Sequence, residues 1–324
     1  MTRSPGAETD PAVPDRDEFL ADLLAGLSAP PYALSPKYLY DRRGSELFDR
    51  ICEQEAYYPT RTELGIFAKR GPEMAERVGP GALVVELGSG SSNKTRALLD
   101  HLEDPAAYVP VEISGDHLQA AAERIQAAYP DLRVLPVCAD YTRDFRLPRP
   151  PRTPGHTLLY FPGSTIGNFD PDDARAFLAR LAALAGPGGG LLIGVDLAKD
   201  TGVLERAYDD PEGVTAAFNR NLLTRMQNEL GAELDPAGFI HRAEFNGELG
   251  CVEMHLVSLR QQVIRVGGRE FPFAAGQSLR TERSYKYTLA GFETLARKAG
   301  WTVTTVWTDD RQWFSVQYLE AGGA

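Results

Sequence analysis

The sequence predicts an α/β fold in which a mainly parallel sheet is covered by helices on both faces. Between residues 83 and 196, short apolar runs alternate with longer segments of helical periodicity. Strands that alternate with helices in this way form parallel sheets. Three successive runs are each ended or closely followed by an acid, at the strand ends where such sheets bind ligands. A chain of 324 residues can bury a large core, as one large or two ordinary domains.

The N-terminal elements follow from periodicity, caps and breakers. Phe19, Leu20, Leu23 and Leu24 have helical spacing, and Thr62 is the expected N-cap of a later helix. The expected order is a helix over 14–29, a helix from 62 to about 78, a strand over 83–86, a helix to about 102, a strand over 108–112, a helix over 116–129, strands over 133–137 and 157–161, a helix over 171–184 and a strand over 190–196.

After Asp196 the alternation lapses for about 90 residues and then resumes. The expected elements are a helix over 214–230, a strand over 251–266 that forms a hairpin with 269–273, a strand over 283–287, a helix over 289–298 that ends at Gly300, and strands over 301–307 and 312–319. The lapse is an insertion between the fifth strand and the last helix, and we expect it to bind the substrate.

Composition excludes several classes of protein. The net charge of −11 and the pI of about 5.1 argue against tight binding to nucleic acid, whose phosphates require a basic surface. No apolar run approaches the roughly 20 residues that span a bilayer, so no membrane association is expected. Residues 1–17 are polar and proline-rich without the apolar core of a signal peptide, and we expect a disordered tail.

The cysteines and histidines indicate neither disulfides nor a metal. Cys52, Cys138 and Cys251 are odd in number and far apart, which argues against a disulfide framework. The five histidines show no metal-ligand spacing. We therefore expect a cytoplasmic protein without a metal.

The segment 83–95 carries the strongest local motif. Its apolar run contains Glu86, enters a turn at Gly88 and Gly90, and leads into a helical pattern. A dinucleotide fingerprint would need a further glycine at Asn93. An acid two residues before the first glycine instead resembles the first motif of class I S-adenosylmethionine-dependent methyltransferases, although Ser92 replaces the usual third glycine. The alternative is a glycine turn that binds no ligand.

The next two strands extend the resemblance. Glu112 ends the second strand, where a carboxylate can accept hydrogen bonds from both ribose hydroxyls. Asp140 and Tyr141 follow the third strand, and in methyltransferases an acid with a flat neighbour contacts the adenine at this place. Each acid taken alone is equally explained as a loop carboxylate. Three acids at this spacing predict a class I, Rossmann-like methyltransferase with a seven-stranded sheet that has one antiparallel strand.

The loop after the fourth strand, 161–169, faces the transferred methyl group in amino-group methyltransferases. It lacks the Asn/Asp-Pro-Pro-Tyr sequence of the enzymes that methylate adenine and glutamine. Asn168 either caps the helix that begins near Pro171 or holds a carboxylate or amine in the cleft.

From residue 37 to residue 317 the chain resembles the L-histidine Nα-methyltransferases, which make trimethylhistidine (hercynine), the precursor of ergothioneine. The strings that carry the resemblance are KYLYD at 37–41, YYPTRTE at 57–63, VELGSG at 85–90, GSTIGN at 163–168, KDTG at 199–202, AYDD at 207–210, VTAAFNRN at 214–221 and TERS at 281–284. The resemblance implies trimethylation of the α-amino group of free L-histidine with S-adenosylmethionine as co-substrate, and we expect a monomer.

The resemblance also implies roles for individual residues. The catalytic residues would be Tyr40, near the reacting amine, and Tyr57, against the imidazole. The cofactor site would comprise Gly88, Lys94, Glu112, Asp140 and Tyr141. The substrate site would comprise Tyr57, Asn168 and Tyr208, Met254 along the side chain, and Glu282, Arg283 and Ser284, with Glu282 and Ser284 reading the ring's other polar edge. Glu112 and Tyr141 replace the aspartate and phenylalanine expected in relatives. The alternatives are ordinary half-buried tyrosines at 57 and 208, and a solvent-facing charge at Glu282.

The expected division places a cofactor domain at 62–198 and 286–324 and a substrate-recognition domain at 18–61 and 199–285. Three other functions stay open from the residues: methylation of another free amino acid or small amine, binding of the cofactor without catalysis, and methylation of protein or nucleic acid. The retained loops argue against the second, and the charge and the loop at 161–169 argue against the third.

Overall fold

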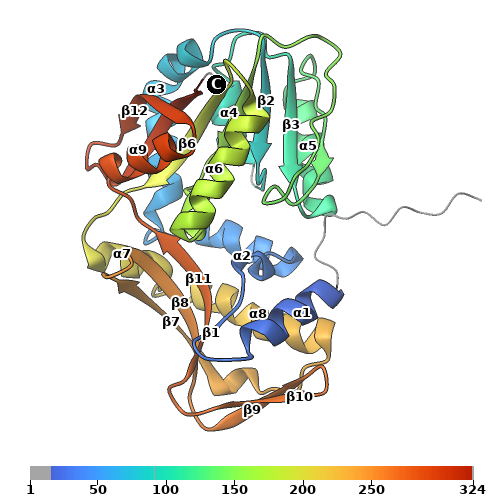
Figure 1. Cartoon of the computed structure of the whole chain (residues 1–324), viewed down its shortest axis with the longest axis vertical. Coiled ribbons are helices and arrows are strands. Elements are labelled where there is room, and N and C mark those ends of the chain that lie inside the picture. Colours follow the sequence, from blue (N-terminus) through green and yellow to red (C-terminus); the bar gives the residue numbers. More distant parts are fainter. Residues whose placement is uncertain (1–15, 91, 323–324) are drawn as a thin grey trace, which may run out of the picture.

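The computed structural model describes residues 16–90 and 92–322. A large sheet with helices on both faces stands above a smaller sheet with its own helices (Figure 1). The predicted tail, 1–17, lies outside the described residues as far as residue 15, and Arg16 and Asp17 already belong to the first helix. Within the described part, no helix is long and apolar enough to cross a membrane.

The large sheet has seven strands in the order β12-β13-β6-β5-β2-β3-β4. Only β13 runs antiparallel to its neighbours, as predicted for this fold class. The strands are β2 (Ala82–Leu87), β3 (Ala107–Glu112), β4 (Val137–Cys138), β5 (His156–Phe161), β6 (Gly190–Asp196), β12 (Trp301–Thr308) and β13 (Phe314–Ala321).

Both faces of the strands β2, β3 and β6 are buried, which explains why these strands read as nearly continuous apolar runs. In β2, Leu83, Val85 and Leu87 pack on one face, whereas Ala82 and Val84 pack on the other. The first face is covered by α6 (Pro171–Ala185) and α9 (Leu289–Lys298), and the second by α3 (Tyr58–Val78), α4 (Ser92–Leu99) and α5 (Gly115–Ala128).

The smaller sheet has the order β1-β11-β8-β7 and lies beside the hairpin β9-β10. Its strands are β1 (Tyr32–Ala33), β7 (Phe239–Asn246), β8 (Cys251–Ser258) and β11 (Ser278–Tyr285), and those of the hairpin are β9 (Gln262–Val266) and β10 (Arg269–Phe273). The helices around it are α1 (Arg16–Gly26), α2 (Arg42–Glu53), α7 (Thr201–Tyr208) and α8 (Val214–Leu230). Short 3₁₀ helices complete the chain: η1 (Pro36–Leu39), η2 (Thr165–Asn168) and η3 (Pro236–Gly238).

Three predicted strands were wrong in their extent, and the one over 283–287 is β11, which begins five residues earlier and ends at Tyr285. The single strand over 251–266 is two strands in different sheets, β8 and β9, because the chain bends at 259–261, where the Ser258 hydroxyl donates to the carbonyl of Arg260. The strand over 133–137 is reduced to β4, and Val134 makes only an isolated bridge to Tyr108. Short strands at a sheet edge have few neighbours, so the local sequence is a poor guide to where such a strand begins and ends.

The predicted start of α3 was also wrong. The helix begins at Tyr58, with Pro59 in its first turn, where a missing backbone N–H costs nothing. Thr62 lies inside the helix, and its hydroxyl donates to the carbonyl of Tyr58, four residues earlier. Such back-bonding satisfies a threonine within a helix, so the residue carries no cap.

The large sheet takes its strands from 82–196 and 301–321, and the smaller sheet from 32–33 and 239–285. The domain boundaries proposed from sequence stay a prediction, but each of these two sheets lies within one of the proposed domains.

Candidate active site

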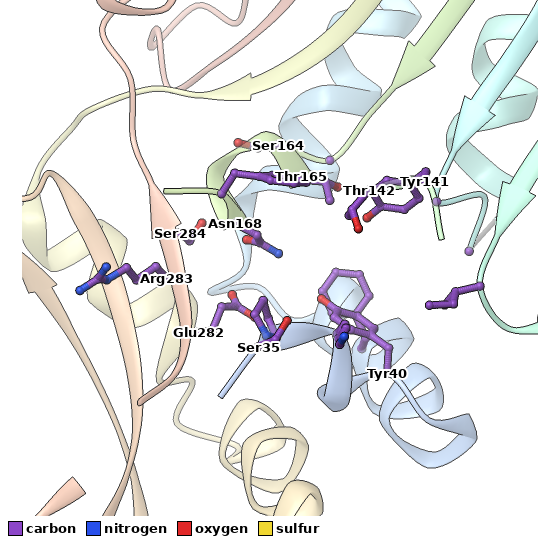
Figure 2. Close-up of a pocket in the computed structure, with 18 of the residues that line it drawn as sticks. Ser35, Tyr40, Tyr141, Thr142, Ser164, Thr165, Asn168, Glu282, Arg283 and Ser284 are labelled. Carbon is purple, nitrogen blue, oxygen red and sulfur yellow. The ribbon is translucent and has the colours of Figure 1, made fainter. Parts of the chain in front are cut away.

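A cavity of about 840 Å³ lies between the carboxyl ends of the large sheet and the smaller sheet. Segments that are far apart in the sequence converge on it (Figure 2). Every site residue predicted from the sequence lines this cavity: Tyr40, Tyr57, Gly88, Lys94, Glu112, Asp140, Tyr141, Asn168, Tyr208, Met254, Glu282, Arg283 and Ser284. Among the described residues, no cluster of His, Cys, Asp and Glu side chains could hold a metal ion.

The glycine turn forms one wall of the cavity. Gly88 follows β2 with φ of +76°, a conformation that side-chain-bearing residues rarely adopt. A Cβ at this position would lie 3.5 Å from Cε1 of Tyr141, in the space between the turn and the aromatic ring. Glu86 holds the turn from behind, because its carboxylate accepts hydrogen bonds from Thr95 at 2.6 Å and Tyr108 at 2.5 Å. Burial raises the pKa of Glu86 to about 7.

Two acids lie at the ends of the next strands. Oε1 of Glu112 accepts from the amides of Ile113 and Ser114 at 2.9 and 3.4 Å, which leaves Oε2 without a partner among the described residues. Burial raises the pKa of Glu112, although these two amides oppose the shift. Asp140 accepts from the amide and hydroxyl of Thr142 at 2.8 and 2.5 Å. An open turn, a carboxylate with one free oxygen and an aromatic ring fit the methionine, ribose and adenine parts of S-adenosylmethionine.

Lys94 makes a contact that the sequence did not reveal. Its Nζ atom lies 2.8 Å from Oε2 of Glu63, and the fully buried Glu63 carboxylate also accepts from the amide of Gly163 at 3.0 Å. Burial disfavours the Lys94 ammonium, but Glu63 outweighs this and raises its pKa. Glu63 stood within the string 57–63, and only its place on the buried face of α3 distinguishes it from an exposed helical acid.

Tyr40 and Tyr57 belong to an aromatic wall at the junction of η1, α2 and α8. The Tyr40 ring packs edge-on against Phe48 and Phe218 at 5.5 and 5.4 Å, and the Tyr57 ring against Tyr208 at 6.1 Å. Neither the Tyr40 nor the Tyr57 hydroxyl makes a side-chain hydrogen bond to a described residue. Burial raises the pKa of both phenols well above the usual range, so both keep their protons at neutral pH.

Glu282 is the acid of the opposite wall. Its side chain is 7% exposed, and its carboxyl group makes no hydrogen bond to any described residue. Burial raises its pKa to about 7, although the Lys286 ammonium acts in the opposite direction. A register shift between Arg280 and Glu282 places Glu282 opposite Met254 on β8, so that both side chains line the cavity. The alternative of a solvent-facing strand charge is therefore wrong.

Arg283 lines the edge of the cavity, but its guanidinium is bound elsewhere. Nε donates to Oε1 of Glu253 at 2.8 Å, and Nη1 to Oδ1 of Asp170 at 3.0 Å. Figure 2 shows this side chain pointing away from Glu282 and Tyr40. Neighbouring residues on a strand face opposite sides, so Arg283 stabilises the rear of the strand on which Glu282 and Ser284 face the cavity.

One side of the cavity holds three polar residues close together, Asn168, Tyr208 and Ser284. The predicted alternative for Asn168 was a helix cap, but Asp170 holds the N-cap position of α6. The Asn168 amide makes no side-chain hydrogen bond to a described residue. The Tyr208 hydroxyl lies 2.7 Å from Oγ of Ser284, which is also 2.8 Å from Nζ of the buried Lys286. Lys286 could not be found from the sequence, because a lysine between Tyr285 and Tyr287 looks like a solvent-facing strand residue.

Comparison with known proteins adds an independent line of argument. A family model described as "Histidine-specific methyltransferase, SAM-dependent" matches residues 19–321. The histidine N-alpha-methyltransferase of Mycolicibacterium smegmatis is 43% identical over 293 residues, 89% of this chain and 90% of the relative. That of Mycobacterium tuberculosis is 41% identical over 294 residues, again 89% of this chain and 90% of the relative. A solved structure of a possible exported protein from Bordetella parapertussis shares the fold alone, with 15% identity, a TM-score of 0.50, and coverage of 93% of this chain and 86% of that chain.

Proposed function

Because the chain belongs to the SAM-dependent, histidine-specific methyltransferase family, we propose that it trimethylates the α-amino group of L-histidine to hercynine, the precursor of ergothioneine. S-adenosylmethionine, when bound, supplies an electrophilic methyl group on a sulfonium. Gly88, Glu112, Asp140 and Tyr141 would hold it at the carboxyl ends of the large sheet, with Lys94 beside the turn. The chain's own task is to present a neutral amine in line with that methyl group and to exclude water.

The observation that carries the proposal is the Glu282 carboxyl group. It is buried, has no hydrogen-bond partner among the described residues, and faces the same cavity as the glycine turn. A buried acceptor without a partner strongly favours a ligand that supplies a donor and rejects one that does not. An imidazole N–H is such a donor, whereas an aliphatic or phenyl side chain would leave the carboxyl group unsatisfied.

The aromatic wall suits a nitrogen that becomes a quaternary cation. Tyr40 and Tyr57 present neutral phenols whose hydroxyl oxygens can accept a hydrogen bond from the amine. Their rings also attract the growing positive charge, and this cation–π attraction does not depend on N–H groups that successive methylation removes. Asn168 and Tyr208 would hold the α-carboxylate, so that the amine points toward the bound methyl donor.

We also propose that the enzyme acts as a cytoplasmic monomer on the free amino acid. A single chain supplies all the predicted site residues, Cys52, Cys138 and Cys251 form no disulfide, and the net charge of −11 opposes nucleic-acid binding. Light scattering after size-exclusion chromatography tests the monomer, because a stable dimer would double the measured mass.

Mass spectrometry of the reaction products tests the reaction. The protein is incubated with S-adenosylmethionine and an equimolar mixture of the amino acids. We expect histidine to gain three methyl groups in succession, with fragment ions placing all of them on the α-nitrogen. Methylation of an imidazole nitrogen, or faster turnover of another amino acid, would contradict the proposal and favour a methyltransferase of a different small amine.

A further inference from the structure

A cluster of buried charges lies directly behind Tyr208 and Ser284. Asp196 ends β6, and its carboxylate lies 2.8 Å from Nζ of Lys286 and 2.5 Å from Nζ of Lys199. The side chains of Asp196 and Lys286 are each 1% exposed, and that of Lys199 is 4% exposed. Two ammonium groups thus share one carboxylate, which also accepts from the Tyr58 hydroxyl at 2.7 and 2.8 Å. These contacts fix the position of the Lys286 ammonium beside the cavity.

The hydrogen-bond donors of Lys286 are all used. An ammonium group has three donors and no acceptor. In this structure Nζ of Lys286 lies 2.8 Å from the Asp196 carboxylate, 2.9 Å from Oη of Tyr208 and 2.8 Å from Oγ of Ser284. Both hydroxyl oxygens therefore accept from Lys286, and neither hydroxyl can donate to it.

The two hydroxyl hydrogens of Tyr208 and Ser284 determine whether a hydrogen-bond donor faces the cavity. Oη of Tyr208 and Oγ of Ser284 are 2.7 Å apart, so one of their two hydroxyl hydrogens lies between them. The other hydrogen has no acceptor inside the triangle of Lys286, Tyr208 and Ser284. This count holds whichever of the two hydroxyls donates to the other. Because both residues line the cavity, the remaining hydrogen is available to a ligand there.

A second donor converges on the same place. A Cβ at Gly167 would lie 2.8 Å from the carbonyl oxygen of Tyr285 and 3.4 Å from Oγ of Ser284, so only glycine lets η2 approach β11 this closely. Asn168 follows directly, and Figure 2 shows it beside Ser284. Its amide offers two further N–H groups that no described side chain accepts. Donors that converge on one place suit a group that only accepts, such as a carboxylate.

We propose that Lys286, held by Asp196, is a positioning residue for substrate binding: by occupying the acceptor sites of Tyr208 and Ser284, it forces one hydroxyl to donate to the α-carboxylate of the amino acid. The inference rests on the proposed function and extends it. Lys286 itself does not touch the substrate, and its effect reaches the ligand through the two hydroxyls.

Paired ligands that differ only in the carboxylate test this inference. Titration calorimetry in the presence of S-adenosylhomocysteine measures the affinity of wild type and of Lys286→Met for L-histidine and for histamine, which lacks the carboxylate. We expect Lys286→Met to weaken histidine binding about tenfold to a hundredfold and histamine binding less than about threefold. In turnover, the KM for histidine should rise while kcat changes much less. Affinity for S-adenosylhomocysteine itself reports whether the variant is folded.

Lys199→Met is the matched control, because it removes one positive charge from the same cluster without touching Tyr208 or Ser284. We expect it to leave the ratio of histidine to histamine affinity close to that of wild type. Lys286→Gln, which keeps amide donors at the same place, should restore part of the ratio. It also supplies the comparison if Lys286→Met fails to bind S-adenosylhomocysteine.

An equal loss for both ligands, or the same selective loss in Lys199→Met, would overturn the role of Lys286. The two proposals fail separately. If wild type trimethylates histidine but the affinity ratio is unchanged in the Lys286 variants, only the positioning role is wrong. If wild type does not methylate histidine, the proposed function is wrong.

Discussion

The Nζ atom of Lys94 lies 2.8 Å from Oε2 of Glu63 and joins α4, which follows the glycine turn, to α3. Glu63 also accepts from the amide of Gly163, in the loop after β5. One fully buried carboxylate therefore holds two of the loops that line the cavity. Buried carboxylates are stable only when paired and hydrogen-bonded, and this one is both. Through Glu63, Lys94 therefore helps to fix the two segments of the chain that line the cavity near the glycine turn.

Gly88→Val should abolish detectable binding of S-adenosylhomocysteine. A valine at φ of +76° is strained by about 1–2 kcal/mol, and its side chain would occupy the space in front of Tyr141. Gly79→Val is the matched control, since Gly79 has φ of +74°, has open space around it and ends α3. Both variants should lose stability in thermal unfolding, but only Gly88→Val should lose the calorimetric binding signal. Equal affinities in the two variants would contradict this site.

Glu112→Ala should weaken S-adenosylhomocysteine binding about tenfold or more. The variant removes the free carboxylate oxygen that would accept from the ribose hydroxyls, and a hydrogen bond to a charged group is worth roughly 1.5–3 kcal/mol. Glu123→Ala, at an exposed position on α5, changes the net charge equally and should bind like wild type. If the two variants bound equally well, Glu112 would not contact the ribose.

Glu282→Ala should raise the KM for histidine about tenfold to a hundredfold while leaving cofactor affinity nearly intact. Tryptophan, whose ring lacks the second polar edge, should lose much less, so the preference for histidine should narrow. Steady-state kinetics with both amino acids measure the two effects together.

Arg283→Met is the control for Glu282→Ala, because it changes the neighbouring residue on the same strand. The Arg283 guanidinium contacts Glu253 and Asp170, so its loss should cost about 1 kcal/mol of stability and change the histidine KM only slightly. A larger KM effect at Arg283 than at Glu282 would show that the two roles are reversed.

The stability of the unliganded protein should depend on pH through Glu282. Burial raises the pKa of this group from 4.5 to about 7, so the folded state binds the proton more tightly than the unfolded state. The stability that this proton contributes is fully present below about pH 4.5 and is lost as the pH rises through about 7. Glu282→Gln stays neutral throughout, so above pH 7 it should be the more stable protein by up to about 3 kcal/mol.

Urea unfolding of Glu282→Gln and wild type at about pH 5 and about pH 8 measures this difference. Glu86 has a pKa raised in the same direction, but it is present in both proteins and cancels. Glu248→Gln, at an exposed turn, controls for the change of net charge. A stability difference that does not grow with pH would show that Glu282 is not a buried acid in solution.

The parallel sheet was predictable because each of its strands carries its own signal. Both faces of β2 and β6 are buried, so almost every residue is apolar, with Glu86 and Asp196 the exceptions at the strand ends, and the glycine turn after β2 follows from local conformation. The positions of Glu112 and Asp140 were also predictable, because the carboxyl ends of parallel strands meet at one edge of the sheet. The N-cap predicted at Thr62 was wrong because a threonine near the start of a helical pattern looks the same in the sequence whether it lies inside the helix or at its cap.

The residues proposed to bind the substrate could not be predicted from the local sequence pattern. The register shift before Glu282 decides which residues of β11 face the cavity, and it depends on pairing with β8, which lies more than twenty residues earlier. Lys286 looked like a surface lysine because its counter-charge, Asp196, is remote in the sequence. From the sequence, only the resemblance to a known family singles out Glu282 and Tyr208.

The sequence by itself determined the class of fold, the cofactor edge of the sheet and, through its family strings, thirteen of the residues that line the cavity. Tertiary structure alone decided which polar atoms in that cavity are free and which are already bound. Arg283 is committed to Glu253 and Asp170, whereas the Glu282 carboxyl group is left open. The physical reason is that a hydrogen bond satisfies a buried group only within about 3 Å, and the partners at that distance come from distant parts of the chain.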